Sequence, residues 1–318
     1  MLTAMSEAPP LVSIANLTVR YGKTEAVHGI SLEIPRGAIF GFIGPNGAGK
    51  TSTIKVLATL IRPSSGTVRV CGHDVRTHAS EVRCKIGYMP DFFGVYDDLT
   101  AEEYLHFFAA AYHIPGAKRR ILIADVLALT DLTAKAQAPV EGLSRGMKQR
   151  LGIARLLLHD PEFLLLDEPA NGLDPRARIE MRELLKELQT MGKTILISSH
   201  ILHELAQFCS HIGILEQGRV VAAGPLREIY RTLALDRAIH VQFAGDAAPH
   251  LDAMRAIAGV VSVEEQPDRL VIRLREGELS PEDLLDAIRA TGARVRMFQP
   301  DAVDMETAFM KLTEGKTA

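Results

Sequence analysis

The residues best suited to chemistry form a glycine-rich stretch at positions 44–51, GPNGAGKT. It fits the phosphate-loop pattern G-x-x-x-x-G-K-[ST] at every fixed position. Glycines let the backbone wrap closely around an anion, so that successive N–H groups point at phosphate oxygens. Lys50 would then reach the β- and γ-phosphates of a nucleotide, and the Thr51 hydroxyl would ligate Mg²⁺. The stretch predicts a nucleotide site, against the alternative of a glycine-rich turn that binds nothing.

A second group of reactive side chains follows two apolar runs further along the chain. Asp167 and Glu168 come directly after the run 163–166, and His200 comes shortly after the run 194–198. Asp167 can hold Mg²⁺, directly or through water, and Glu168 can polarise an attacking water molecule. Ligands bind at the carboxyl edge of open α/β sheets, so we expect His200 at the same edge as the phosphate loop and Glu168. The alternatives are an acidic turn and a structural histidine.

A serine at a helix start predicts a second place for an anion. Ser144 precedes a helical pattern that runs to about residue 158, and serine is a favoured N-cap. Its hydroxyl, Gly146 and the free N–H groups of the first turn resemble the anion sites found at helix N-termini. Asp174 is placed to cap the next predicted helix, with Pro175 at its first position.

The flanking segments predict the elements that position these residues. The run 38–43 is apolar and of strand length, and residues 52–60 have a helical pattern, which gives the strand–loop–helix context that a phosphate loop requires. The positive end of that helix faces the same anion. Upstream, 11–20 and 27–34 have the alternation of half-buried strands. The turn between them carries Tyr21, whose ring either covers an apolar edge or stacks on a nucleotide base.

Helices and a second module complete the predicted organisation. Residues 100–133 have helical periodicity, broken at Pro115, and predict a helical insert in an α/β scaffold. From about residue 232 the composition changes. Strands are predicted there at 238–243, 260–265, 270–274 and 294–298, with helices at 251–258, from Ser280 to Gly292 and at 304–312. We therefore divide the chain into a loose tail at 1–10, a domain at 11–230 with a helical subdomain at about 92–158, and a small α+β domain at 231–318.

Composition excludes several classes of protein. The 318 residues are 47% hydrophobic and 24% charged, which is ordinary for two globular domains. A formal net charge of −3 gives no electrostatic case for a nucleic-acid partner. Cys71, Cys84 and Cys209 are scattered and odd in number, which indicates a reducing compartment. No run approaches the length of a transmembrane helix, and residues 1–10 lack the pattern of a signal peptide.

Residues of about 11–225 together resemble the nucleotide-binding domain of ABC transporters. Six motifs in the family's order carry the resemblance. They are Tyr21 at the adenine-stacking aromatic, 44–51 at Walker A, 143–147 at the signature, 164–168 at Walker B with the catalytic glutamate, 173–174 at the D-loop and His200 at the switch histidine. Arg145 and Met147 depart from the signature LSGGQ, and Asp91 stands where the family has glutamine. Aspartate offers oxygens but no amide donor, so the γ-phosphate sensing of that glutamine is not carried over.

The resemblance implies a P-loop NTPase core of α/β class, with a parallel sheet, an antiparallel β subdomain and a helical insert, followed by the small α+β domain. It implies ATP and Mg²⁺ as cofactors, Glu168 and His200 as catalytic residues, and Thr51, Asp167 and Asp91 as metal ligands. The residues expected to bind the nucleotide are Tyr21, Gly44, Pro45, Asn46, Gly47, Ala48, Gly49, Lys50, Thr51, Ser52, Asp91, Ser144, Gly146 and Asp174.

The resemblance also implies partners, because in this family the signature of one subunit completes the phosphate-loop site of another. One copy of each motif implies a homodimer with two shared ATP sites and a separate integral membrane permease. We expect an exporter of drug, ion or lipid type, peripheral on the cytoplasmic face of the membrane. The C-terminal module resembles the α/β tail of such exporters, and two-gene exporters often carry an acidic residue at the position of Asp91.

The alternatives are an importer ATPase, a soluble ABC ATPase acting on ribosomes or DNA, and a P-loop kinase. Sugar importers of the family usually carry a longer, all-β C-terminal domain. Soluble members have tandem cassettes or a long coiled coil and a basic surface, none of which is visible in the sequence. The signature and His200 argue against a kinase.

Loop aromatics predict where the permease docks. Phe92, Phe93 and Tyr96 fall in a loop directly after Asp91, and exposed aromatics often anchor interfaces. The alternative is local core packing, which we expect for Tyr104 and Phe108 at their helical spacing.

Overall fold

The computed structural model describes residues 9–91, 94, 98–201, 204–205, 207–226, 228–229, 237–245, 250–275 and 278–300. Phe92, Phe93, Tyr96 and the helix predicted at 304–312 lie outside these residues. The chain divides into two compact units, Met1–Gly224 with Gly315–Ala318 and Pro225–Glu314. Each unit is described by itself.

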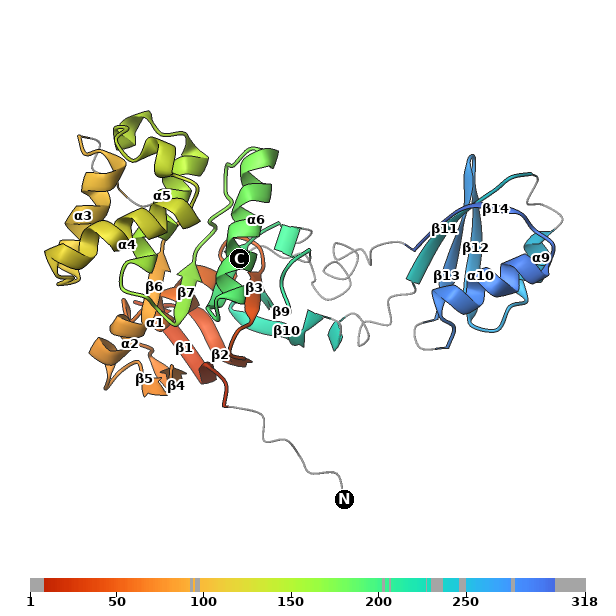
Figure 1. Ribbon diagram of the computed structural model, residues 1–318. Helices are drawn as coiled ribbons and strands as arrows, with labels where there is room; N and C mark the ends of the chain where they lie inside the picture. Colours follow the sequence, from red (N-terminus) through yellow and green to blue (C-terminus); the bar gives the residue numbers. More distant parts are fainter. Residues whose placement is uncertain are drawn as a thin grey trace, which may run out of the picture. The chain divides into compact units, whose positions relative to one another are not determined.

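A six-stranded sheet forms the centre of the first unit (Figure 1), with the order β10-β9-β3-β8-β7-β6. Its strands are β3 (Ile39–Ile43), β6 (Ile86–Met89), β7 (Phe163–Leu166), β8 (Thr194–Ser199), β9 (His211–Glu216) and β10 (Arg219–Pro225). The pairs β3–β8, β3–β9, β6–β7 and β7–β8 are parallel. Every residue of β3, β7 and β8 is buried, which explains their unbroken apolar runs. The parallel pairing brings the segments after β3, β7 and β8 to one edge.

A second, four-stranded sheet has the order β2-β1-β4-β5. It contains β1 (Val12–Tyr21), β2 (Thr24–Ile34), β4 (Ser65–Val70) and the short β5 (His73–Asp74), paired antiparallel. Helix α1 (Lys50–Leu57) shares one hydrophobic core with strands of both sheets through buried Ile54, Val56 and Leu57. The predicted bounds of this helix, 52–60, were wrong. It begins at Lys50, within the phosphate-loop motif 44–51, and Thr59 has a left-handed φ of 60° that ends it early.

Three helices gather in the insert: α3 (Ala101–Ala111), α4 (Gly116–Leu129) and α5 (Arg145–Leu157) (Figure 1). Short 3₁₀ turns η1 (Thr133–Lys135) and η2 (Val140–Gly142) connect α4 to α5. Thr100 and Glu103 form a capping box at the start of α3. Tyr104 is fully buried, as predicted, and its ring contacts Phe108 at 4.9 Å between centroids. Helices α2 (Ala79–Lys85) and α6 (Pro175–Thr190) belong to the same unit.

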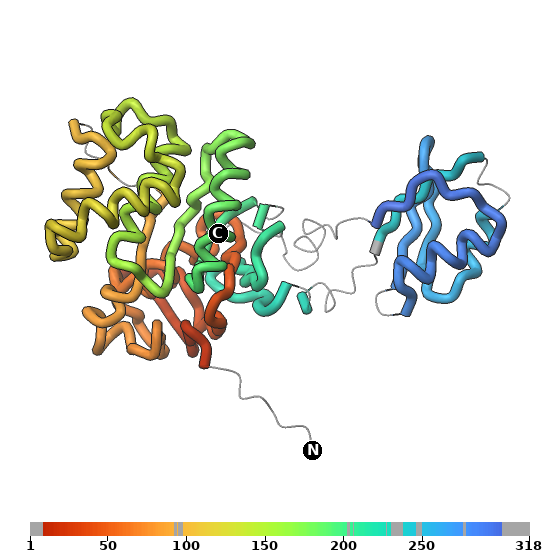
Figure 2. The backbone as a smooth tube through the Cα atoms, in the orientation of Figure 1, coloured from red at the N-terminus to blue at the C-terminus, as the bar shows by residue number. Residues whose placement is uncertain are grey.

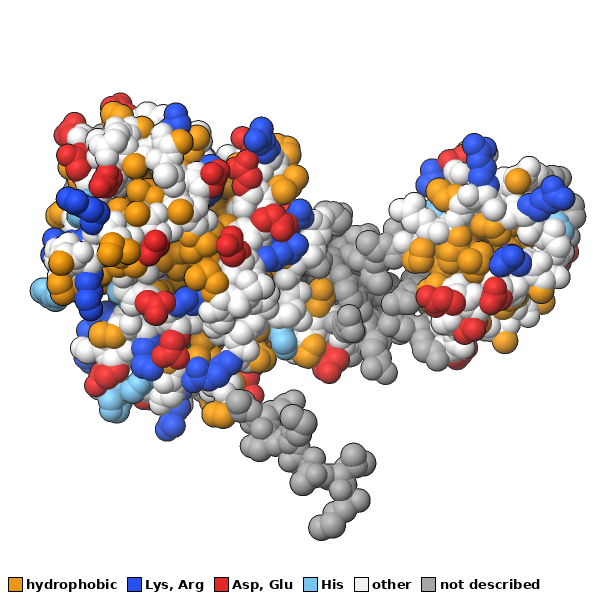
Figure 3. All heavy atoms as spheres, viewed as in Figure 1, with side chains coloured by type: hydrophobic (Ala, Val, Ile, Leu, Met, Phe, Trp, Pro, Cys, Tyr) orange, Lys and Arg blue, Asp and Glu red, His pale blue; other side chains and the backbone are white. Residues whose placement is uncertain are grey.

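Some large apolar side chains of the insert stay exposed. They are Phe107 on α3, Tyr112 directly after it and Ile121 on α4, with exposures of 49%, 39% and 68%. Figure 3 shows hydrophobic side chains among charged ones over this part of the unit. The insert therefore keeps apolar surface beyond what its own core uses.

The second unit has the order β11 (Arg237–Phe243), α9 (Leu251–Arg255), β12 (Val260–Gln266), β13 (Arg269–Leu274), α10 (Pro281–Ala290), β14 (Val295–Pro300). The strands pair antiparallel in the order β12-β13-β11-β14. Figure 2 traces the backbone of this unit in the blue colours of the C-terminal part of the chain. Met254 of α9 and Leu284 and Ile288 of α10 share a core with alternate residues of β13, so both helices cover one face of the sheet. This βαββαβ order is ferredoxin-like.

Two further observations concern the burial of the cysteines and the length of the helices. Cys71 and Cys209 are buried, whereas Cys84 on α2 is exposed. Burial raises the pKa of Cys71 to about 11. Among the described residues, no helix is long and apolar enough to cross a bilayer.

Candidate nucleotide site

The phosphate loop occupies the connection between β3 and α1, where its glycines meet neighbouring backbone. A Cβ on Gly44 would lie 2.3 Å from the carbonyl oxygen of Leu215 in β9, so only glycine fits there. Lys50 is 6% exposed, and its Nζ donates to the carbonyl oxygens of Gly44 at 2.6 Å and Pro45 at 3.1 Å. The loop is thereby folded back around its own lysine.

The Lys50 ammonium also faces Glu168, which follows β7, two strands away from β3 in the sheet. Its Nζ lies 3.7 Å from Oε1 of Glu168. Burial lowers the pKa of Lys50, and the carboxylates of Glu168 and Asp167 oppose that shift. The charged Lys50 ammonium is therefore largely buried at the pocket, where phosphate oxygens would stabilise its charge.

Asp167 connects three elements at the end of β7. It is 2% exposed, and its Oδ1 accepts hydrogen bonds from Ser198 Oγ at 2.7 Å and Thr51 Oγ1 at 3.3 Å. A hydroxyl and a carboxylate at this distance suit Mg²⁺, which takes few protein ligands and keeps waters and phosphates. No group of three or more His, Cys, Asp or Glu side chains suited to a metal occurs among the described residues. Thr51 Oγ1 and Asp167 Oδ1, 3.3 Å apart, fit as ligands of the ion.

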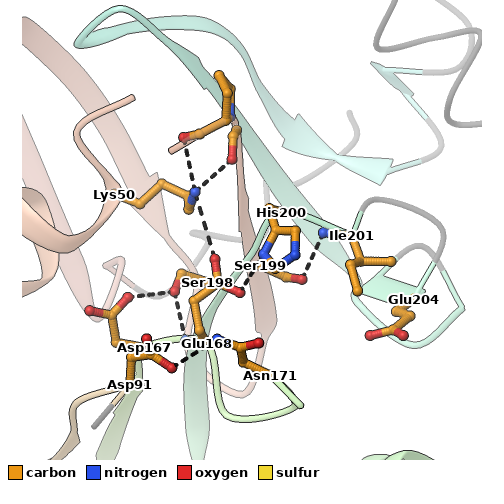
Figure 4. A network of polar contacts seen from close by, with 12 residues as sticks. Lys50, Asp91, Asp167, Glu168, Asn171, Ser198, Ser199, His200, Ile201 and Glu204 are labelled. Carbon is orange, nitrogen blue, oxygen red and sulfur yellow. Dashed lines mark hydrogen bonds and ion pairs between the residues drawn. The ribbon is translucent and has the colours of Figure 1, made fainter. Parts of the chain in front are cut away.

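Glu168 follows in a left-handed conformation, with a φ of 51° that is uncommon for this residue type. Its backbone N–H donates to Ser198 Oγ at 2.9 Å, which fixes the turn. Its Oε2 lies 2.9 Å from Nδ1 of His200, so the carboxylate sits between the histidine and Lys50 (Figure 4). Such a carboxylate is held in one orientation while 13% of its side chain stays accessible to a water molecule.

The structure adds three residues that sequence reasoning did not assign to the site: Ala26, which lines the pocket described below, and the polar residues Ser198 and Asn171. Ser198 joins Asp167 to the Glu168 backbone, as described above. Asn171 Nδ2 donates to Oδ1 of Asp91 at 3.2 Å, beside Glu168 (Figure 4). For Ser198 and Asn171 the only available signal in the sequence was their position at or after the ends of the predicted strands.

A pocket of about 370 Å³ brings most of the predicted residues together. It is lined by Ala26, Asn46, Gly47, Ala48, Gly49, Lys50, Thr51, Ser52, Asp91, Glu168, Asn171 and His200. Tyr21 lies next to it, since its hydroxyl donates to Ser52 Oγ at 3.4 Å, and its side chain is 48% exposed. The exposed ring leaves a face for a base.

Seven predicted residues do not line this pocket. Four of them contact residues that do, namely Tyr21, Gly44, Pro45 and Asp167. The other three, Ser144, Gly146 and Asp174, lie at the starts of two helices. Ser144 Oγ accepts a hydrogen bond from the Met147 N–H at 3.3 Å and so caps α5. Gly146 lies in the first turn of the same helix. Asp174 Oδ1 accepts from the Ala177 N–H at 2.8 Å and caps α6. Among the described residues, the nucleotide pocket of one chain therefore contains no part of the signature.

Comparison with known proteins identifies this arrangement. The sequence profile described as ABC transporter matches residues 27–171. The chain is 33% identical over 309 residues to the linearmycin resistance ATP-binding protein LnrL of Bacillus subtilis, an alignment that covers 96% of this chain and 99% of LnrL. The chain belongs to the ABC transporter ATP-binding family. The family hydrolyses ATP, so this protein is an ABC ATPase.

Other relatives and solved structures match about 70% of this ABC ATPase. The Nod factor export ATP-binding protein I of Ralstonia nicotianae is 39% identical over 220 residues, 69% of this chain and 68% of that protein. A solved structure of an ATP-binding subunit of an ABC transporter matches with a TM-score of 0.63 and 32% identity, over 70% of this chain and 92% of that one. The structure of cbiO1 from Clostridium perfringens, part of the ABC transporter complex cbiONQ, matches with a TM-score of 0.64 and 27% identity. This match covers 70% of this chain and 91% of cbiO1. The predicted family and fold class are confirmed.

Proposed function

We propose that this ABC ATPase powers export through a separate membrane permease, as one half of a homodimer that closes on ATP. Its role as the ATP-binding subunit of an ABC transporter follows from the family. The direction is our inference, supported by the relatives named for Nod factor export and linearmycin resistance. The observation that carries the homodimer is the pocket itself, which lacks Ser144 and Gly146 of its own chain.

The residues of the pocket support a division of work during hydrolysis. Lys50 and the N–H groups of the loop bind the β- and γ-phosphates. Mg²⁺, held by Thr51 and Asp167, would neutralise charge on those phosphates. Glu168 accepts a proton from the attacking water, and His200 fixes the carboxylate at 2.9 Å. Ser144 and Gly146 of a second subunit, at the start of α5, would cover the γ-phosphate from the opposite side.

Position 91 has a different role from the usual glutamine. Asp91 accepts a hydrogen bond from Asn171 and lines the pocket, yet it has no donor to offer a phosphate oxygen. We propose that it contacts Mg²⁺ or its water and holds Asn171 in place. This role uses only oxygen atoms that the carboxylate possesses.

Export is tested in inverted membrane vesicles that contain the ATPase and its permease. Linearmycin and a Nod factor are suitable probes, because relatives are named for them. ATP-dependent accumulation inside the vesicles supports export from the cytoplasmic face, with Glu168→Gln as the inactive control. ATP-driven loss of probe from preloaded vesicles would instead favour an importer.

The permease is proposed to dock on Phe92, Phe93 and Tyr96, which follow Asp91 in the sequence. Replacing all three with Ala should abolish co-purification with the permease, since each anchor contributes on the order of 2 kcal/mol. Fold and basal ATPase activity of the isolated subunit should persist. Met191→Ala, which removes an apolar side chain 57% exposed beyond α6, is the control. Unfolding of the triple variant would mark these residues as core, and normal binding would move the docking surface elsewhere.

A further inference from the structure

The segment at residues 171–174, between the carboxylates of β7 and the start of α6, is anchored toward the nucleotide pocket. Asn171 donates its backbone N–H to the Glu168 carbonyl at 3.0 Å and its side-chain amide to Asp91. Both Asn171 and Asp91 line the pocket (Figure 4). The first residue of the segment is thus fixed to the chain's own ATP site.

The next residue is anchored in a different direction, by Arg145 of the signature. Gly172 has a φ of 69°, and a Cβ on it would lie 2.6 Å from Cζ, 2.6 Å from Nη1 and 3.0 Å from Nε of Arg145. Nearly equal distances to three atoms of one planar group mean that the Gly172 Cα faces the flat side of the guanidinium. Arginine can pack in this way, whereas the ammonium of lysine has no flat face.

Among the described residues, no polar contact explains where Arg145 lies. Within the described part of the chain, its guanidinium takes part in no hydrogen bond or ion pair. Arg145 is exposed, and the close approach of its guanidinium to Gly172 is the contact that can hold it in this place by packing. The side chain occupies the place that any residue larger than glycine would need at position 172.

The helices that begin here are in equally close contact. A Cβ on Gly146 would lie 3.0 Å from the Ala177 Cβ, so the first turns of α5 and α6 touch. Ser144 caps one helix and Asp174 caps the other. The signature therefore packs directly against the segment 171–174 and the start of α6, and the segment is connected to the pocket through Asn171 and Asp91.

We propose that Arg145 is a positioning residue that holds Gly172, and with it Asn171, against the start of the signature helix. The inference rests on the proposed dimer, in which Ser144 and Gly146 serve the partner's ATP. Nucleotide in a subunit's own pocket acts on Asp91 and Asn171, and the Arg145–Gly172 contact transmits the change to the signature offered to the other site. The two ATP sites are thereby coupled within each subunit.

Arg145 has one rival role, as a cation that attracts the phosphates of the partner's ATP. The two roles differ in what they require of the side chain. Packing on Gly172 needs the planar guanidinium, whereas attraction of phosphate needs only positive charge. Arg145→Lys separates them, because it keeps the charge and removes the flat face.

The experiment measures kcat, KM and the Hill coefficient of ATP hydrolysis by the purified full chain. The variants are Arg145→Ala, Arg145→Lys, Gly172→Ala and the double variant Arg145→Ala with Gly172→Ala. Arg120→Ala on α4 is the matched control, an exposed arginine without a polar partner among the described residues. ATP binding by each variant is measured separately, by the displacement of a fluorescent nucleotide analogue by ATP. The fold of each variant is checked by thermal unfolding.

We expect wild type and Arg120→Ala to hydrolyse ATP with a Hill coefficient above 1. Arg145→Ala and Arg145→Lys should both lower kcat by roughly 5-fold or more and bring the Hill coefficient to about 1, with ATP affinity unchanged. Gly172→Ala should act similarly by displacing the guanidinium. The double variant should lose less activity than the two single effects multiplied together, because one contact is removed twice.

Each contrary result overturns the inference. Normal activity of Arg145→Lys beside an impaired Arg145→Ala would assign the residue to charge attraction. Multiplicative effects of Arg145→Ala and Gly172→Ala, or a non-cooperative wild type, would exclude coupling through this contact. Failure of the dimer itself has a different signature, since wild type would then not hydrolyse ATP and Glu168→Gln would not dimerise with ATP.

Discussion

Glu168 and His200 face each other from the ends of two neighbouring parallel strands, with Oε2 2.9 Å from Nδ1. The histidine side chain is 45% exposed, whereas that of the glutamate is 13% exposed. The more buried carboxylate is therefore oriented by a group at the surface, and that surface is where a second subunit would close on the nucleotide.

Replacement of His200 by Ala should impair hydrolysis more than binding. Glu168 would keep its contact with Lys50 and lose the group that aims its free oxygen at water. We expect kcat to fall by about 10²-fold, with ATP affinity within about threefold of wild type, or roughly 0.7 kcal/mol. Steady-state ATPase assays and nucleotide titration measure the two quantities. His106→Ala on α3 is the control, and an equal loss of affinity would contradict a role confined to hydrolysis.

Glu168→Gln removes the proton acceptor and keeps the shape of the side chain. Hydrolysis should collapse while ATP still binds, so size-exclusion chromatography with ATP should detect a stable dimer. Glu187→Gln on the exposed side of α6 provides the control. Turnover within about threefold of wild type, roughly 0.7 kcal/mol of barrier, would rule out Glu168 as the base.

Lys50→Ala should weaken ATP binding by on the order of 10²-fold, because hydrogen bonds to charged groups are worth about 1.5–3 kcal/mol each. The phosphates would lose the cation that the loop holds in place through Gly44 and Pro45. Lys55→Ala, on the same helix, is the matched control and should bind normally. Isothermal titration of ATP measures the difference, and near-normal affinity of the Lys50 variant would remove the basis for the phosphate-loop assignment.

Glu162 directly precedes β7 and forms ion pairs with Lys85 and Arg36, which precede two other strands of the parallel sheet. The contribution of these pairs to stability should depend on pH. The Glu162 carboxylate lies 2.7 Å from Lys85 Nζ and 3.3 Å from Arg36 Nη1. The hydrogen bond from Lys85, with help from Arg36, holds the pKa of Glu162 below its ordinary value of 4.5.

Because the folded pKa is depressed, the stabilisation is fully present above pH 4.5 and is lost as the pH falls through the lower folded pKa. Glu162→Gln should therefore be less stable than wild type at neutral pH by about 0.5 kcal/mol, since the pair is partly exposed. The difference should shrink at acid pH. Urea unfolding at several pH values measures it, with Glu187→Gln as a control that should change nothing; a difference independent of pH would contradict the ion-pair explanation.

The parts of the site that could be predicted from sequence are those whose information is local. The phosphate loop has its fixed residues within eight positions, and Asp167, Glu168 and His200 follow strands whose apolar runs are visible in the sequence. Their meeting at one edge follows from the parallel sheet. In the structure Lys50, Glu168 and His200 line one pocket, and Asp167 contacts Thr51 of the same pocket.

The contacts that could not be predicted join residues far apart in the chain. Ser198 and Asp167 are separated by 31 positions, and Asn171 and Asp91 by 80. The packing of Arg145 on Gly172 depends on the angle at which α5 and α6 begin, which no periodicity encodes. Helix ends were also missed, because Thr59 reaches a left-handed conformation that its residue type does not favour.

One of the three cysteines can be labelled selectively with a fluorescent dye. Cys71 and Cys209 are buried and have raised pKa values, so Cys84 is the thiol open to a maleimide dye under mild conditions. Its neighbour Arg83 donates to Thr59 Oγ1 at 3.2 Å, just beyond the helix that starts at the phosphate loop. A fluorophore on Cys84 of the unmutated chain therefore lies one residue from this contact, and its emission during addition of ATP tests whether nucleotide binding reaches α2.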